Sequence, residues 1–264
     1  MKTLREHVDL LRKKPWGRRL ENTLRFRGRL LVSVGDTNSS FWCPGWRTLD
    51  MVDADHICDI RKEKLPFGDH SVDIVNCSHV VEHLRKGGES AFFYKEVLRV
   101  LKPDGLFRVA TPDADRLLEK YREGDWAYFL RGDGLHMMYQ IQSRKLPPEV
   151  LLIHNRLVGW FASYSGRLDT AGGPLVDKEE VDRRVATMDA EDFSDWCMSL
   201  LEPGRIYAHV NVYTYERLKK DLLEAKFQRV ERLDFNQSSA PEIARFHVDR
   251  EAERDYSIYC DAMP

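Results

Sequence analysis

The segment Ser71–Leu84, with the sequence SVDIVNCSHVVEHL, joins a short apolar run to a more polar stretch. Its first part, Val72–Cys77, is rich in β-branched residues, as are parallel strands that are covered on both faces. Ser90–Leu101 follows with apolar residues at helical spacing, and the turn formers Lys102–Gly105 come after it. Leu106–Ala110 is a further short apolar run. This order predicts a strand, a helix, a turn and another strand.

The same alternation continues upstream. Leu30–Val34 is an apolar run that stops at Gly35, and Arg47–Met51 and His56–Ile60 fit two further short strands. Strands that alternate with helical stretches predict a doubly wound α/β sheet. A ligand of such a sheet lies at the carboxyl ends of the strands. The residues expected at these ends are Gly35, Asp50, Asp59, Cys77 and Ser78.

Downstream, the stretch 115–207 breaks this rhythm, because it is long, rich in aromatic residues and mixes helical patches with turn clusters. We expect a largely helical insertion or cap at 115–207, between two parts of one core at 30–114 and 208–264. In the second part, Thr214 can cap a helix that turns Leu218, Leu222 and Leu223 inward, and residues 229–235 and 256–261 fit two final strands. Residues 1–29 fit an amphipathic N-terminal helical segment.

Composition narrows the class of protein. The 264 residues include 41 basic and 43 acidic ones, a formal net charge of −2, so no excess of positive charge favours nucleic acid as a partner. Five scattered cysteines show no zinc-binding or redox spacing, which fits reduced thiols in a cytoplasmic protein. No apolar run is long enough to span a bilayer.

The order of several short motifs carries a family resemblance. They are Cys58–Ile60, Leu65–Phe67, Ser71–Val75, Asn76–Leu84 and Glu96–Gly105. Together they resemble the class I S-adenosylmethionine-dependent methyltransferases of the type 11 kind. The resemblance implies an α/β fold with a Rossmann-like, doubly wound and mostly parallel sheet, for which we expect an antiparallel last strand.

The resemblance also implies a cofactor site for S-adenosylmethionine. Asp59 would accept a hydrogen bond from the adenine amino group, with Ile60 beside the ring, and the loop Cys77–His79, with Ser78 and His79 after the fourth strand, would lie near the methionine part. From the residues themselves, Gly35 suits backbone contact with the cofactor, and Asp50 suits hydrogen bonds to the ribose hydroxyls.

The first loop departs from the family pattern, because Gly35 is followed by Asp36–Ser40 instead of further glycines. Asp36 would lie unfavourably near the carboxylate of the cofactor, whereas Asn38 tolerates positive φ and the hydroxyl side chains can donate hydrogen bonds. A rival hypothesis is therefore a catalytically degenerate binding or scaffold protein that keeps the fold.

The tail, with His209–Thr214, Pro241–Glu242 and Tyr256–Tyr259, is similar to predicted methyltransferases of glycan-assembly pathways. This similarity favours O-methylation of a sugar or other small hydroxylated acceptor. An N-methyltransferase that acts on an amino sugar or small amine is a further alternative. The expected partner is a small-molecule or glycan acceptor, with a homodimer as one option.

Methylation of an alcohol calls for a base, and histidine titrates in a suitable range. His154 is the first choice because a cap segment is where acceptor-specific groups belong, and His83 and His209 are further catalytic candidates. Glu82 and His83, with an acid from the insertion, are an option for Mg²⁺. Neighbours on a helix point about 100° apart, however, so both cannot easily face one ion. We therefore assign no metal ligands.

Overall fold

A computed structural model describes residues 28–38, 45–130, 141–142, 148–162, 175–201, 209–246, 248–249 and 251–264. Its strands are β1 (Leu31–Val34), β2 (Trp46–Asp50), β3 (His56–Ile57), β4 (Val72–Ser78), β5 (Leu101–Pro112), β6 (Arg229–Leu233) and β7 (Ser257–Met263). Its α-helices are α3 (Glu89–Val100), α4 (Ala114–Arg122), α5 (Trp126–Phe129), α7 (Ile153–Phe161), α8 (Lys178–Thr187), α9 (Ala190–Ser199), α10 (Tyr215–Glu224) and α11 (Pro241–Phe246). Short 3₁₀ helices are η1 (Val81–His83), η2 (Pro148–Leu151) and η3 (Glu251–Glu253).

The strands form a seven-stranded sheet in the order β3-β2-β1-β4-β5-β7-β6. The pairs from β3 to β5 are parallel, whereas β7 runs antiparallel to both β5 and β6. This topology confirms the predicted doubly wound, mostly parallel sheet with an antiparallel last strand. The order reverses beside β1, so the carboxyl ends of β1 and β4 border a crevice of the kind that binds ligands in such sheets.

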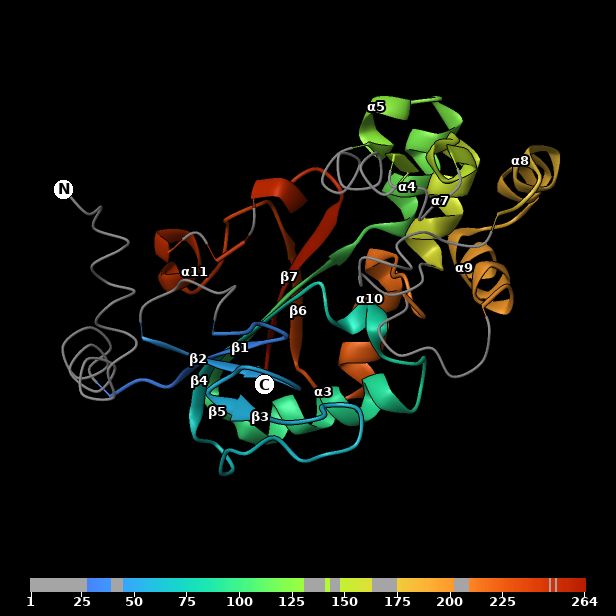
Figure 1. Cartoon of the computed structure of the whole chain (residues 1–264). Helices are drawn as coiled ribbons and strands as arrows, with labels where there is room; N and C mark the ends of the chain where they lie inside the picture. The colour runs from blue at the N-terminus through green and yellow to red at the C-terminus, as the bar shows by residue number, and fades with distance from the viewer. Residues whose placement is uncertain are drawn as a thin grey trace, which may run out of the picture.

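Apolar residues cover both faces of the sheet because side chains alternate along each strand. Val32, Val75 and Phe107 belong to the larger core, which also contains α3 and α10 residues. On the opposite face, Leu31 and Ile74 pack with residues of the α11 region. Figure 1 shows α3 and α10 on one side of the sheet and α11 on the other.

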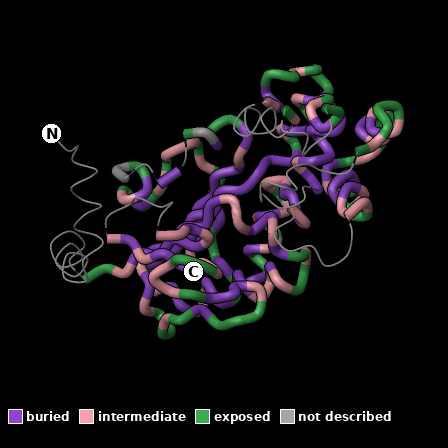
Figure 2. The backbone as a smooth tube through the Cα atoms, viewed as in Figure 1, coloured by how far each residue is buried: buried purple, intermediate pink, exposed green. Residues whose placement is uncertain are grey.

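A second core lies within a group of helices beyond one end of the sheet. It contains residues of α4, α5, α7, α8 and α9, together with Val212 and Tyr256. Figure 1 shows these helices gathered at the end of β5, and Figure 2 shows buried backbone running from the sheet into them. The helical content of the described part of 115–207 matches the expected character of the insertion. Its boundaries as a domain stay a prediction.

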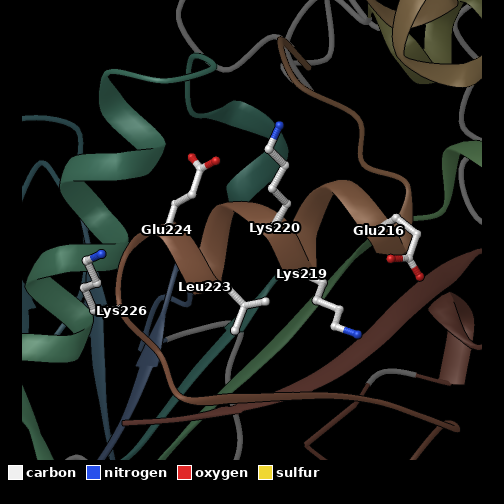
Figure 3. A pocket seen from close by; sticks show the side chains of 6 residues that line it. All are labelled: Glu216, Lys219, Lys220, Leu223, Glu224 and Lys226. Carbon is white, nitrogen blue, oxygen red and sulfur yellow. The ribbon is translucent and has the colours of Figure 1, made fainter.

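Two predicted details are wrong. Lys102–Gly105 is not a turn outside the sheet but part of β5: Val72 pairs with Leu101 and Ile74 with Leu106, with a register shift between them. Such a bulge accommodates Pro103, which has no N–H for a regular ladder. On α10, Leu218 and Leu222 are buried, but Leu223 is 41% exposed. Figure 3 shows Leu223 beside Lys219 in a surface hollow bordered mainly by charged side chains.

Element ends also differ from the predictions. The third strand stops at Ile57 instead of Ile60, and the sixth stops at Leu233 instead of Phe235. None of the helices in the described part of the chain is long and apolar enough to cross a membrane. The predicted N-terminal helical segment covers residues 1–29, of which residues 1–27 lie outside the described residues.

A buried ion network joins β5 to β7. Arg108 is fully buried, and its guanidinium donates hydrogen bonds to Asp249 and, at 3.2 Å, to Asp261. Asp261 also accepts hydrogen bonds from the Ser238 hydroxyl and from the Ser239 N–H, each at 2.8 Å. Because both carboxylates are buried too, each charge depends on its partners. The network fixes the segment after β6 against the sheet.

Candidate functional site

A pocket of about 210 Å³ opens at the carboxyl ends of β1, β2 and β4. Gly35 follows β1 and Asp50 ends β2, and both line it. Asp59, Ile60 and His79 line it as well. The structure therefore brings together six predicted site residues, these five and the catalytic candidate His83, because the carboxyl ends of neighbouring parallel strands meet at one edge of the sheet.

Gly35 forms the floor of this pocket together with Val80. Gly35 has φ +79°, which strains any residue with a Cβ atom. A Cβ atom added there would lie 2.0 Å from Cγ2 of Val80, which also lines the pocket. The close approach between the first loop and the segment after β4 thus requires glycine at position 35.

In the rest of the loop that follows β1, polar side chains point into the protein and form hydrogen bonds there. Asp36 is 2% exposed, and its carboxylate accepts a hydrogen bond from the Ser33 hydroxyl at 2.6 Å. The Asn38 side-chain oxygen accepts one from Thr48 at 2.9 Å, and the Asn38 N–H donates to the carbonyl of Asp53. Among residues 35–38, Gly35 alone has positive φ. Asp36 is not among the residues that line the pocket.

The Asp59 carboxylate is bound by residues that follow it closely in the sequence. Its two carboxylate oxygens accept hydrogen bonds from Nε and Nη2 of Arg61 at 2.7 and 2.8 Å, and from the Arg61 N–H at 3.2 Å. Lys62 Nζ lies 3.4 Å from one of them. The Arg61 hydrogen bonds lower the pKa of Asp59 to about 2. A carboxylate offers about four lone-pair positions, so a ligand that uses Asp59 has to displace one of these contacts.

We expect Arg61→Ala to lower the free energy of unfolding at pH 6 by about 1–2 kcal/mol. Because the pKa of Asp59 is depressed in the folded state, its stabilisation is complete above the unfolded pKa near 4 and is lost as pH falls through about 2. Urea unfolding of both proteins at pH 6, 4 and 3 measures this difference. Arg229→Ala, at an exposed pair with Glu231, is the matched control. A difference between wild type and Arg61→Ala that stays constant with pH would contradict the assignment.

Glu82 is a fully buried acid beside the pocket. Its carboxylate oxygens lie 3.2 Å from Nδ1 of His79 and 3.2 Å from the Thr111 hydroxyl, which donates to it. Burial raises the pKa of Glu82, but the neighbouring imidazoles, His79 first, outweigh burial and lower it to about 2. The backbone carbonyl of Glu82 accepts hydrogen bonds from the N–H groups of Val210 and Asn211.

Two further imidazoles lie against Glu82. His83 lines the pocket, and its ring centroid is 4.9 Å from that of His209. Nδ1 of His209 is 2.7 Å from the Trp160 carbonyl oxygen. A carbonyl can only accept, so Nδ1 carries the hydrogen and Nε2 keeps its lone pair. Burial lowers the pKa of His209 to about 4, so the ring is neutral near pH 7.

Residues 50–109 match the sequence model of a family described as a methyltransferase domain. The match begins at the acid that ends β2 and runs through β4, α3 and most of β5. This part of the chain is similar to a methyltransferase domain. The match agrees with the predicted resemblance to S-adenosylmethionine-dependent methyltransferases and covers 60 of the 264 residues. No curated protein sequence matches the chain.

Several solved methyltransferase structures are similar to the chain. One from Mesorhizobium loti shares 15% identity, covers 96% of this chain and 100% of its own, and has a TM-score of 0.40. The 1,6-didemethyltoxoflavin N1-methyltransferase of Burkholderia thailandensis, with bound S-adenosylhomocysteine, shares 12% identity over 100% of this chain and 91% of its own, at 0.37. Phosphoethanolamine N-methyltransferase 2 of Haemonchus contortus shares 10% identity over 100% of this chain and 60% of its own, at 0.36. These similarities do not indicate the acceptor.

The structure brings some predicted residues together and separates others. Cys77 and Ser78 do not line the pocket: Cys77 is in the core, and the Ser78 hydroxyl donates to Glu253 at 2.9 Å. His154, the first choice for the base, is buried on α7. Burial lowers the pKa of His154, and the α8 residue Lys178 lowers it further. His154 therefore lies among the helices α7 and α8 and is not one of the residues that line the pocket. Ser39 and Ser40 lie outside the described residues.

The sequence did not point to Val80 or Arg61, which also line the pocket. Val80 and Val81 are consecutive valines, and the sequence does not indicate which of the two faces a ligand. The sequence also suggested that Glu82 and His83 cannot easily face one ion. The ligating atoms of Glu82, His83 and His209 all lie within 4.8 Å of one another, so the argument from helix geometry is wrong here. A 3₁₀ turn of three residues does not hold side chains in the directions of a regular helix.

Proposed function

We propose that this methyltransferase transfers a methyl group to a hydroxyl of a sugar or other small hydroxylated acceptor. The single observation that carries the proposal is the pair of imidazoles, His83 and His209, beside the pocket at the strand ends. An alcohol needs a proton acceptor at physiological pH, whereas an uncharged amine needs less assistance.

The residues of the pocket fit S-adenosylmethionine. In this proposal Gly35 would leave room for backbone approach, Asp50 would accept hydrogen bonds from the ribose hydroxyls, and Asp59 and Ile60 would contact the adenine; all four line the pocket. One oxygen of Asp50 accepts from the N–H of Val52, and a carboxylate has capacity for further hydrogen bonds. When bound, S-adenosylmethionine supplies an electrophilic methyl carbon on a sulfonium.

His83 and His209 mark the acceptor side of the site. His83, which lines the pocket, is our candidate to take the hydroxyl proton, and the hydrogen bond to Trp160 fixes the His209 ring beside it. The Trp160 ring is 6.3 Å from the His209 ring and 4.8 Å from that of Tyr256. Aromatic faces suit the apolar side of a sugar ring. This arrangement supports a small hydroxylated acceptor held between the helical group and the pocket.

Transfer of a labelled methyl group to a panel of sugars, amino sugars and simple amines tests the proposal. We expect Asp50→Ala to weaken binding of S-adenosylmethionine at least about tenfold, since it removes hydrogen bonds to a ligand. His83→Ala should keep that binding and lower transfer by about 10²-fold, the order of general base catalysis. Loss of transfer in His154→Ala, with His83→Ala unchanged, would contradict the assignment. Transfer to amines alone would replace O-methylation with N-methylation.

A further inference from the structure

Three ligating side chains converge next to the pocket from two distant parts of the chain. Glu82 and His83 belong to η1, and His209 begins the described segment that leads to α10. Their ligating atoms all lie within 4.8 Å of one another. The convergence is fixed by the backbone, because the Glu82 carbonyl accepts hydrogen bonds at 2.8 and 3.1 Å from the N–H groups of Val210 and Asn211.

The groups around these side chains are those that orient metal ligands. A histidine that binds a metal usually donates its other ring N–H to a backbone carbonyl or a carboxylate, and a ligating carboxylate is itself hydrogen-bonded. His209 makes such a bond from Nδ1 to Trp160. Glu82 contacts His79 on one oxygen and Thr111 on the other. Its Oε1 is buried without a hydrogen bond of normal geometry, although His79 lies 3.2 Å away.

The geometry points to a binding site for one divalent transition-metal ion on Glu82, His83 and His209, which holds the acceptor hydroxyl next to the cofactor pocket. Two imidazoles and one carboxylate suit Zn²⁺, Fe²⁺ or Mn²⁺. Mg²⁺ prefers oxygen ligands, so the predicted Mg²⁺ gains no support from this donor set. A tetrahedral ion with bonds of about 2.0–2.1 Å separates its ligand atoms by about 3.4 Å, so the side chains close by about an ångström on binding.

Three protein ligands leave open positions on the ion, as in catalytic sites. His83 also lines the cofactor pocket, so the open side faces the place where the methyl group is transferred. With the ion bound, the two imidazoles would act as its ligands instead of as the base. The ion would lower the pKa of a bound hydroxyl, whose proton would pass to solvent. The oxygen then bonds to the methyl carbon while the carbon–sulfur bond breaks and its electron pair stays on sulfur. Expansion to five ligands would leave two open positions, which favour acceptors with two neighbouring hydroxyls. This last step rests on the proposed function.

Calorimetric titration of the full chain, stripped with a chelator, tests the site with Mn²⁺, Zn²⁺ and Mg²⁺ separately. We expect one Mn²⁺ or Zn²⁺ per chain and weaker binding of Mg²⁺. His83→Ala and His209→Ala should each weaken binding at least as much as the about 10–100-fold loss known for outer-shell partners. The control is His70→Ala, because His70 precedes β4 whereas the three ligands lie at its other end. Co²⁺ absorption reports on the ligand set independently.

Absence of binding by Mn²⁺ and Zn²⁺, or equal affinity in His83→Ala and wild type, would overturn the inference. His83 is only partly buried, so this variant should fold, and urea unfolding checks that it does. A titration with S-adenosylmethionine in the presence of chelator measures cofactor binding without metal, and so tests the proposed function separately from the metal site. If methyl transfer to vicinal diols proceeds at full rate in chelator, the metal site is wrong and the methyltransferase assignment stands.

Discussion

Gly35→Ala is expected to reduce the affinity for S-adenosylmethionine by at least about tenfold, which is about 1.4 kcal/mol. The new Cβ atom would lie 2.0 Å from Cγ2 of Val80, and Val80 has to move because the contact is far below van der Waals distance. A valine is stiff at χ1, so it cannot rotate away freely. Since Val80 and Gly35 both line the pocket, the displacement changes the cofactor site itself. Calorimetric titration measures the affinity.

Two matched variants separate the overlap from the backbone strain. Gly87 has φ +82° and no atom within 4 Å of an added Cβ, so Gly87→Ala carries the strain alone and should leave the affinity unchanged. The double variant Gly35→Ala/Val80→Ala removes the overlap and should recover part of the affinity. If Gly35→Ala binds as tightly as wild type, Gly35 does not shape the cofactor site.

Arg108→Met is expected to destabilise the folded protein by about 3–5 kcal/mol, because it leaves the buried carboxylates of Asp249 and Asp261 without their cation. The side chains of all three residues are 0% exposed, so water cannot replace the lost partner. Urea unfolding followed by circular dichroism measures the change in free energy.

The control for Arg108 is Arg183→Met, since Arg183 is 64% exposed and pairs with Glu180 on the surface of α8. Exposed pairs contribute about 0–1 kcal/mol, so this variant should unfold almost as wild type does. Equal effects of the two substitutions would show that the buried network does not stabilise the fold.

The fold was largely predictable because the strands of the parallel sheet are short apolar runs separated by helices. Boundaries were less predictable: Lys102–Gly105 has the composition of a turn, yet the chain re-enters the ladder at Leu101 and forms a bulge. Leu223 follows Leu222 in sequence, and only the packing of α10 decides that Leu222 faces the core and Leu223 the solvent. Arg108 lies inside an apolar strand, and its partners are more than 140 residues away along the chain.

Some features of the candidate site could likewise be predicted from the sequence, and others could not. Gly35, Asp50 and Asp59 were found because the ends of parallel strands meet, which is a general property of the sheet. His154 was chosen from its place in the insertion, but the packing of α7 against α8 determines its surroundings. The approach of His209 to Glu82 depends on hydrogen bonds between segments far apart in sequence, for which neither segment carries a local signal.

The most direct measurement is a calorimetric titration of the purified protein with S-adenosylmethionine and with S-adenosylhomocysteine. The pocket with Gly35 at its floor and Asp50 and Asp59 on its walls predicts binding of both at one site per chain, with affinities in the micromolar range, on the order of −8 kcal/mol. Absence of heat with either ligand, in a protein that unfolds cooperatively, would contradict the central claim that this fold retains a working cofactor site.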